Sequence, residues 1–240
     1  MPETGRLRQE IEEAVGPLKS VDFALPISGV QMRITMPEDF EMLLDAAAGD
    51  PEQNLPYWAE IWPSGIALAE AIVAHPDLVR GRRVIEIGSG LGVTAGAALK
   101  AGAHLTVADY SPESLLLCRY NCLSNTSLEP DTMTLNWRDP SPEFRELVGS
   151  GFPVVLAADV LYETRDIEPM LDLIEWLVEP DGLFWLAEPG RNVAERFNER
   201  ATECGWTDSV TFHAGPWPDP RDFNVAVTVH QMRRVSSHGN

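Results

Sequence analysis

Long hydrophobic runs are missing from this sequence. The longest apolar stretches are only as long as a strand, and residues 1–16, MPETGRLRQEIEEAVG, are charged where an export signal needs an apolar centre. We therefore expect neither an export signal nor a membrane span, and we expect a cytoplasmic protein.

Cysteine is also scarce. Cys118, Cys122 and Cys204 cannot all pair with one another, and no second ligand cluster accompanies the first two. The five histidines show no metal-ligand spacing either. We expect reduced cysteines in helices and no metal site.

Positive charge is in short supply. Asp and Glu total 37 against 18 Lys and Arg, which gives a formal net charge of -19. Such a chain repels a phosphate backbone unless its basic residues cluster, and no cluster is visible. We expect no nucleic-acid partner. The acidity either keeps the protein soluble or favours a partner with a basic surface, and both readings stay open.

The apolar and charged content, 44% and 23%, is typical of a folded globular protein. From residue 82 onward, strand-like and helix-like patterns alternate, which predicts a mostly parallel sheet with helices on both faces. The alternation breaks at TDSVTFHA (207–214) and FNVAVTVHQMRR (223–234), which only a Pro-rich loop separates. We expect these two segments to close the sheet as an antiparallel hairpin.

The N-terminal part has a different pattern. Residues 20–36 contain two short β-like runs around Ser28, and a short helix is expected at about 38–48. Ser64 is the predicted cap of a helix that Pro76 ends. We expect residues 1–55 to form an extension made of a helix, a β-hairpin and a helix, and residues 56–240 to form one α/β domain.

The segment VIEIGSGLG (84–92) is a buried strand that leads into a glycine turn, a geometry that lets a nucleotide-type ligand approach backbone N–H groups. A tight turn without a ligand is the alternative. Val93 stands where a dinucleotide fingerprint needs glycine, which weakens an NAD reading. Glu86 is an acid inside an apolar strand, so we expect a cationic or hydrogen-bonding ligand near it. Asp109 ends the next strand, where a carboxylate can accept ribose hydroxyls.

This combination of acids and glycines, over roughly residues 80–232, resembles the class I S-adenosylmethionine-dependent methyltransferases. The resemblance implies a Rossmann-like, seven-stranded, mostly parallel sheet with helices on both faces and a C-terminal antiparallel hairpin. It also implies S-adenosyl-L-methionine as cofactor and S-adenosyl-L-homocysteine as product. The cofactor-binding candidates from these motifs are Glu86, Gly88, Ser89, Gly90, Gly92, Asp109 and Tyr110.

Two further stretches, LPYWAEIWPSGIALAE (55–70) and AADVLYE (157–163), together resemble methyltransferase family 16, whose members modify lysines of chaperones, elongation factors and the electron-transfer flavoprotein. By that resemblance Trp62 contacts the cofactor, Trp137 packs beside the adenine and Ala158 offers backbone contact. Asp159 and Tyr162 form the D-x-x-Y motif that faces the methyl group and are the catalytic candidates. Packing roles for Trp137 and Tyr162 are the alternatives.

The resemblance implies in-line transfer of a methyl group to a lysine of a protein substrate. A lysine must first lose a proton, which costs about 4 kcal/mol near pH 7.4. An ionised Asp159 beside the amine raises the amine pKa, so it cannot by itself assist deprotonation. Our hypothesis is that Asp159 and the Tyr162 hydroxyl orient the amine while the proton leaves to water.

Other readings remain for the same residues. A small-molecule, nicotinamide-like N-methyltransferase would share the cofactor half, and a non-catalytic cofactor-binding interaction protein is a third reading. A nucleic-acid methyltransferase is disfavoured because the fourth strand ends in AADVLY instead of an N-P-P-[YFW] motif. We expect the aromatic segment NLPYWAEIWPSG (54–65) to form one wall of the cofactor site, with Trp62 in contact with the ligand and Trp58 in packing.

Overall fold

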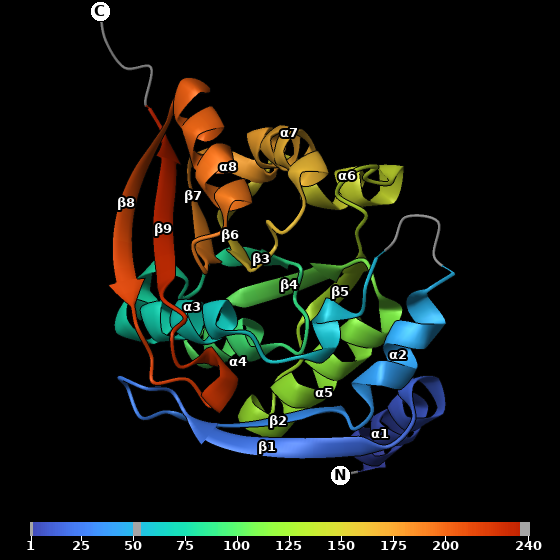
Figure 1. Cartoon of the computed structure of the whole chain (residues 1–240). Coiled ribbons are helices and arrows are strands. Elements are labelled where there is room, and N and C mark those ends of the chain that lie inside the picture. The colour runs from blue at the N-terminus through green and yellow to red at the C-terminus, as the bar shows by residue number, and fades with distance from the viewer. Residues whose placement is uncertain (1, 50–53, 236–240) are drawn as a thin grey trace, which may run out of the picture.

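A seven-stranded sheet forms the centre of the molecule (Figure 1). The computed structural model describes residues 2–49 and 54–235. The strand order is β5-β4-β3-β6-β7-β9-β8, in which β7–β9 and β8–β9 are antiparallel and the other neighbours are parallel. The predicted parallel sheet with a C-terminal hairpin is confirmed. Its strands are β3 (Arg83–Ile87), β4 (His104–Asp109), β5 (Asp131–Thr134), β6 (Phe152–Ala158), β7 (Val178–Glu188), β8 (Trp206–His213) and β9 (Val227–Arg234).

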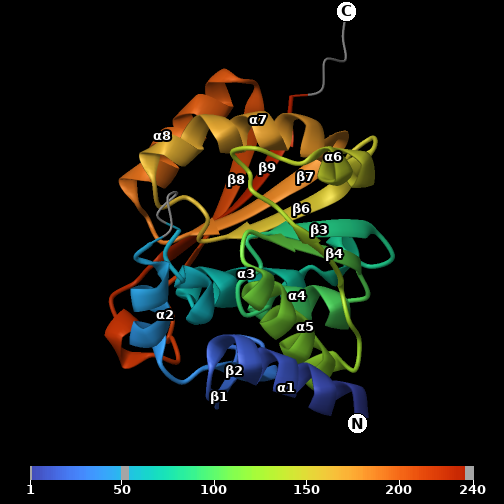
Figure 2. The same cartoon turned by 90° about the vertical axis from the view of Figure 1, so that its right-hand side faces the viewer.

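Helices cover both faces of this sheet, as Figure 2 shows. On one face lie α3 (Pro63–Ala74), α4 (Val93–Lys100) and α5 (Pro112–Thr126). On the other lie α6 (Pro142–Val148), α7 (Ile167–Leu177) and α8 (Asn192–Glu203). Successive side chains of a strand point to opposite faces, so Phe184 and Trp185 of β7 enter different apolar clusters. Residues 183–187 of β7 are buried on both sides, which explains why this stretch is continuously hydrophobic.

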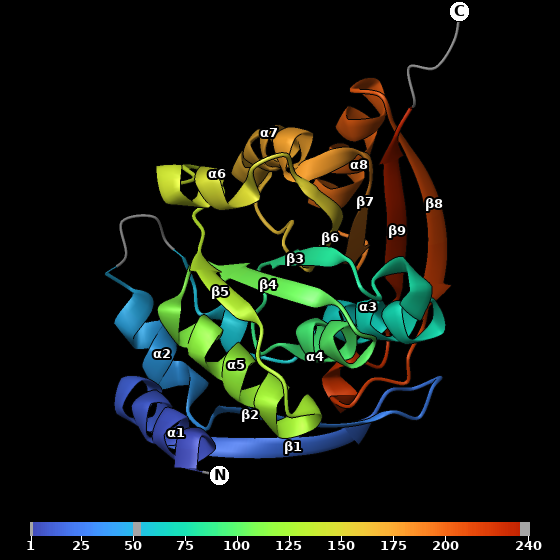
Figure 3. The same cartoon turned by 180° about the vertical axis from the view of Figure 1, so that it is seen from behind.

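The N-terminal elements pack against α5 and the outer side of its helical layer (Figure 3). They are α1 (Pro2–Val15), β1 (Leu18–Ala24), β2 (Gln31–Pro37) and α2 (Phe40–Ala47), with β1 and β2 antiparallel. This confirms the predicted helix, hairpin and helix. The division of the chain at residue 55 stays a proposal, and residues 50–53 beside it lie outside the described residues.

The start of α3 differs from the prediction. Trp62, and not Ser64, is the N-cap, and Pro63 occupies the first helical position. Proline suits that position because its φ is already helical and the missing N–H has no intrahelical partner there. The hydroxyl of Ser64 is thereby free of the capping role and donates to Oδ2 of Asp159 at 3.4 Å. The end of the helix before Pro76 is as predicted.

Helix α6 was not anticipated from the sequence. Its local signal is Ser141 followed by Pro142: the Ser141 hydroxyl accepts a hydrogen bond from the N–H of Phe144 at 3.2 Å, and Pro142 begins the helix. Helix α6 is short, and its buried side chains are Phe144 and Val148. Two such residues are too few to give a helical period in the sequence.

All three cysteines are free. Cys118 and Cys122 are buried in α5, as expected, whereas Cys204 is exposed and follows the last residue of α8, so its predicted helical position is wrong by one residue. Gly205, with φ of +87°, turns the chain there. No helix among the described residues is long and apolar enough to cross a membrane.

Candidate active site

The glycine turn after β3 needs glycine for steric reasons. Gly88, Gly90 and Gly92 all have positive φ, at 69°, 49° and 80°. A Cβ on Gly88 would lie 2.7 Å from Cγ1 of Val160, and one on Gly92 would lie 2.8 Å from the sulfur of Cys118. Any larger residue would strain the backbone and displace a neighbour. The turn thus brings its backbone close to the segment that follows β6.

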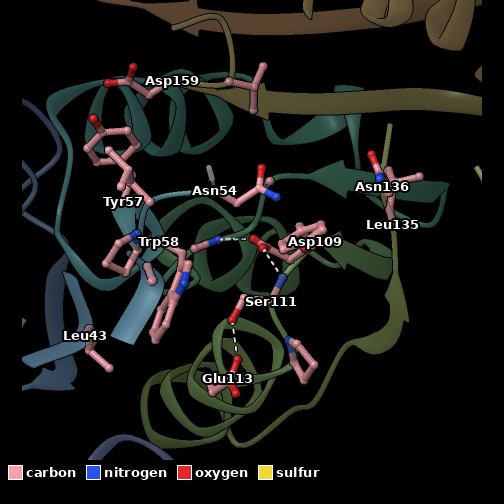
Figure 4. Close-up of a pocket in the computed structure, with 18 of the residues that line it drawn as sticks. Leu43, Asn54, Tyr57, Trp58, Asp109, Ser111, Glu113, Leu135, Asn136 and Asp159 are labelled. Carbon is pink, nitrogen blue, oxygen red and sulfur yellow. Dashed lines mark hydrogen bonds between the residues drawn. The ribbon is translucent and has the colours of Figure 1, made fainter. Parts of the chain in front are cut away.

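Asp109 ends β4 beside this turn and is 6% exposed. Its Oδ2 accepts a hydrogen bond from the Gly90 N–H at 3.0 Å, and its Oδ1 accepts one from the Ser111 N–H at 3.1 Å, as Figure 4 shows. Burial raises the pKa of Asp109 above its ordinary value, although these hydrogen bonds oppose the shift. The carboxylate is therefore held in one orientation at the carboxyl end of the sheet.

A hollow of about 380 Å³ opens over Asp109. Tyr57 and Trp58 lie on one side of it, and Leu135 and Asn136 lie on the opposite side (Figure 4). Nine of the predicted site residues line it: Trp62, Gly88, Gly90, Asp109, Tyr110, Trp137, Ala158, Asp159 and Tyr162. This grouping follows from the parallel sheet, because the carboxyl ends of β3, β4, β5 and β6 meet at one edge.

The aromatic segment forms a wall of this hollow. Tyr57 and Trp58 lie in a short 3-10 turn, η1 (Tyr57–Ala59), and Trp62 follows it. Trp58 packs against the core, as expected, and it also lines the hollow. The Trp62 indole N–H donates to the carbonyl of Tyr57 at 2.7 Å, which fixes the indole beside the tyrosine.

A second, wider hollow of about 730 Å³ adjoins the first. The two share Tyr57, Trp62, Asp159 and Tyr162 in their walls. The Tyr57 ring meets the Trp62 ring edge to face at 6.0 Å between centroids, and it meets the Tyr162 ring at 5.4 Å in the same manner. Three aromatic rings and one carboxylate therefore stand where the hollows meet.

Asp159 has the left-handed backbone angle φ of 58°, which is uncommon outside glycine. Its N–H donates to the carbonyl of Ala187 at 2.9 Å, so β7 holds it in this conformation. Its side chain is 6% exposed and accepts hydrogen bonds from Ser64 and from the guanidinium of Arg191. Arg191, which lies 32 residues further along the chain, is not among the site residues predicted from the sequence.

Tyr162 lies three residues after Asp159 and is largely buried. Burial raises the pKa of Tyr162, and the nearby carboxylates of Asp166, Asp109 and Glu163 raise it further. The phenol therefore stays protonated at any physiological pH. It is available as a hydrogen-bond donor at the junction of the hollows.

Glu86 lines neither hollow, and neither do the turn residues Ser89 and Gly92. Because side chains alternate along β3, Glu86 shares with Val84 the face covered by α4 and α5. Burial raises the pKa of Glu86 well above its ordinary value, and Cys118 and Asp109 add to the shift. No described residue forms a hydrogen bond with its Oε2. Glu86 thus lies behind the glycine turn and lines neither hollow, and its role toward a ligand stays a prediction.

Trp137, the predicted neighbour of the adenine, is held in place by the buried carboxylate of Asp166. Its indole N–H donates to Oδ1 of Asp166 at 3.1 Å, and the same oxygen accepts from Nε of Arg138 at 2.6 Å. Asp166 is fully buried, so this arrangement holds the loop after β5 against the loop after β6. Asn136 and Arg138 also line the first hollow, the one over Asp109, which we call the deep hollow. In the sequence, the only sign of this position is that both residues are adjacent to Trp137. Within residues 2–49 and 54–235, no group of three or more His, Cys, Asp or Glu side chains could hold a metal ion.

Known proteins are similar to this chain in sequence. The histone-arginine methyltransferase METTL23 of Xenopus laevis is 28% identical over 185 residues, which cover 75% of the chain and 72% of that protein. The human electron transfer flavoprotein beta subunit lysine methyltransferase is 32% identical over 145 residues, 57% of the chain and 50% of that protein. The match thus spans about half of the length of the flavoprotein-modifying relative.

Two solved structures share the fold at low sequence identity. The 16S rRNA N2 G1207 methyltransferase RsmC of T. thermophilus superposes with a TM-score of 0.59 at 16% identity, over 90% of this chain and 51% of that one. The magnesium protoporphyrin IX methyltransferase ChlM of Synechocystis, with bound S-adenosylmethionine, gives 0.56 at 14% identity, over 82% and 97%. At these identities the likeness concerns the fold alone.

A family model described as lysine methyltransferase matches residues 53–202, more than half of the chain. The match includes the aromatic segment, the glycine turn, Asp109 and the D-x-x-Y motif. The chain therefore belongs to the lysine methyltransferase family and is an S-adenosylmethionine-dependent methyltransferase.

Proposed function

We propose that this protein transfers a methyl group from S-adenosylmethionine to the side-chain amine of a lysine in a protein substrate. The observation that carries the proposal is the meeting of two hollows at Asp159 and Tyr162. One hollow lies over the buried carboxylate of Asp109, and the other opens toward the surface past Glu163 and Arg191. A donor and an acceptor can thus approach each other from different sides.

The deep hollow fits the cofactor. Its volume, about 380 Å³, lies in the range of small-molecule sites. An ionised carboxylate has about four acceptor positions, so Asp109 can accept ribose hydroxyls as well as its two backbone amides. Leu135 and Trp137 offer an apolar surface for an adenine, and Trp62 lies on the side shared with the second hollow. When bound there, S-adenosylmethionine supplies the activated methyl group.

The residues at the junction serve the acceptor. Asp159 can accept a hydrogen bond from an amine, and the protonated Tyr162 hydroxyl can align it or a bridging water. No protein nucleophile is required, because a neutral amine attacks the methyl carbon directly. The protein contributes by orientation and by restricting water, effects that supply on the order of 7 kcal/mol in well-oriented cases.

A protein substrate agrees with the shape and the charge of the molecule. Tyr57 and the side chains of Glu163 and Arg191 are each about one third exposed, so the second hollow is open to a side chain from a folded partner. The net charge of -19 attracts a basic protein surface. Both relatives found by sequence are named for the modification of proteins.

Arginine is the second candidate acceptor. The match to the histone-arginine methyltransferase covers a larger share of the chain than the match to the flavoprotein lysine methyltransferase, 75% against 57%. Both acceptors are long cationic side chains, so the surface charge favours neither. The chemical identity of the methylated residue distinguishes them.

The test is a labelling experiment with tritiated S-adenosylmethionine. The purified protein is incubated with core histones, with the human electron transfer flavoprotein beta subunit, with a cell extract and with nicotinamide. Label in acid-precipitated protein that elutes as methyl-lysine after hydrolysis supports the proposal. Methyl-arginine supports the second candidate, and label confined to the small-molecule fraction contradicts both.

A further inference from the structure

The proposed function leaves a proton to be explained, because a carboxylate beside a lysine holds the lysine in its charged form. Asp159 is that carboxylate. Its side chain is 6% exposed, so little water screens its charge. The structure places the guanidinium of Arg191 in direct contact with Oδ1 of Asp159, inside the second hollow.

Arg191 is presented to Asp159 by a fastened turn. Glu188, the last residue of β7, accepts hydrogen bonds on Oε2 from the N–H of Gly190 at 2.6 Å and from that of Arg191 at 3.2 Å. Gly190 has φ of +77°, which the turn requires. Glu188 is itself held from β9 by Nε2 of His230 at 3.4 Å, and Nδ1 of His230 lies 2.6 Å from Asp208 of β8. Residues of three strands, β7, β8 and β9, therefore fix the backbone position of Arg191.

The charge inside the second hollow depends mainly on the pair of Asp159 and Arg191, because the other titratable groups there are neutral or already paired. Tyr57 enters from η1, and Tyr162 and Glu163 follow β6. The pKa of Tyr162 is raised, so its phenol is neutral. Glu163 has its own cation, Arg165, at 2.5 Å, with Arg138 at 3.9 Å. The α2 end contributes only Ala47 and Ala48 to the hollow.

We propose that Arg191 neutralises Asp159, so that the acceptor lysine loses its proton near neutral pH. In this step an N–H bond of the ammonium breaks, its electron pair stays on nitrogen, and the proton passes to water in the second hollow. Asp159 keeps its acceptor oxygens for orientation while its charge is balanced. Arg191 acts through Asp159 and is a positioning residue. This inference rests on the proposed lysine acceptor.

The expected size of the effect follows from the charges. A carboxylate within about 4 to 6 Å of an ammonium raises its pKa by about 1 to 3 units, and a cation in the same place lowers it. With the pair intact the two contributions nearly cancel. Without Arg191 the carboxylate acts alone, and the acceptor pKa rises.

The test compares Arg191→Gln, which keeps hydrogen-bond donors and loses the charge, with Arg191→Lys, which keeps the charge. Arg200→Gln, in the helix that follows Arg191, is the control, because Arg200 pairs with the exposed Glu168 and Glu203, outside both hollows. Methyl transfer to the human electron transfer flavoprotein beta subunit is followed from pH 6 to pH 10. Calorimetric affinity for S-adenosylmethionine verifies that each variant is folded.

We expect Arg191→Gln to move the acid limb of kcat/KM upward by about 1 to 2 pH units, with a loss of about tenfold or more at pH 7 that alkaline buffer restores. Arg191→Lys and Arg200→Gln should keep the wild-type profile. A uniform loss with an unshifted profile would show a structural role, and a faster Arg191→Gln enzyme would show that Arg191 blocks the hollow; either overturns the inference. A wild-type protein that methylates no lysine overturns the proposed function first, and the inference with it.

Discussion

Asp159 is the residue on which the chemical interpretation depends. A left-handed backbone at a non-glycine residue costs on the order of 1 to 3 kcal/mol and persists only where the surroundings impose it. Here the hydrogen bond to Ala187 and the contacts with Ser64 and Arg191 impose it. Such strain at the junction of two hollows indicates a position selected for what its side chain does.

Substitution of Asp159 tests this interpretation. Asn is the matched change, because it tolerates positive φ and keeps the shape of the side chain. We expect Asp159→Asn and Asp159→Ala to lower kcat by about 100-fold or more, since an orienting and electrostatic contact is lost. The affinity for S-adenosylmethionine, measured by calorimetry, should stay near wild type. Unchanged turnover would exclude Asp159 from the reaction.

Trp62 is expected to contact the charged part of the cofactor. If its ring faces a sulfonium, Trp62→Ala should weaken S-adenosylmethionine binding by about 0.5 to 2 kcal/mol. Binding of S-adenosylhomocysteine, which has no positive sulfur, should weaken less, and Trp62→Phe should retain part of the affinity. Equal losses for both ligands would reduce Trp62 to a packing residue of the aromatic wall.

Individual site residues were predictable where the fold alone places them. Asp109 ends β4 and Asp159 directly follows β6, and the carboxyl ends of parallel strands converge whatever the details of packing. Arg191 was not assigned, because its contact with Asp159 depends on the turn held by Glu188, which no local motif announces. Glu86 was expected near a ligand, and this stays a prediction: its side chain points to the face of β3 that α4 and α5 cover.

Among the larger elements, the β1–β2 hairpin is tied to α3 through Glu70. Its carboxylate, on a residue only 3% exposed, accepts from the N–H of Ile27 at 2.5 Å and of Ser28 at 3.0 Å. Glu70→Ala should lower the free energy of unfolding by about 1 to 3 kcal/mol, because both amides lose a charged acceptor. Urea denaturation measures this. The control Glu10→Ala, at an exposed position of α1, should stay within about 0.5 kcal/mol of wild type, and an equal effect would contradict the assignment.

The helices show which local signals can be trusted. Ser64 was the predicted cap of α3, but the helix begins at Pro63, because proline fits the first helical position. At α6 a serine and a proline do act together, in the order Ser141 and Pro142. The hydrophobic periodicity predicted the long elements. Helix α6 has only two buried side chains, so only its Ser141 cap could have revealed it in the sequence.

For the molecule as a whole, stability should depend on His230, which joins β7, β8 and β9. Burial opposes the charged imidazole, but hydrogen bonds and charge interactions with Asp208 and Glu188 outweigh it and raise the pKa of His230 to about 9. The unfolded value is about 6.5. A raised pKa means that the contribution to stability is complete below pH 6.5 and is lost as the pH rises through 9.

We therefore expect the free energy of unfolding from urea titrations to fall by on the order of 2 kcal/mol more between pH 6 and pH 9.5 in wild type than in His230→Gln. The variant retains a hydrogen-bonding side chain without the titrating imidazole. The same pH dependence in both proteins would show that His230 does not titrate as the structure indicates.

The charge of the whole molecule, its open second hollow and its family all direct the proposal toward a protein substrate. The most direct test of that claim is the mass-spectrometric identification of the residue methylated by the wild-type protein in a cell extract, with Asp159→Asn as the matched control. The account predicts methyl-lysine in a protein treated with wild type and none with Asp159→Asn, at equal affinity for S-adenosylmethionine. Methylation of small molecules alone, or an equally active Asp159→Asn protein, would contradict it.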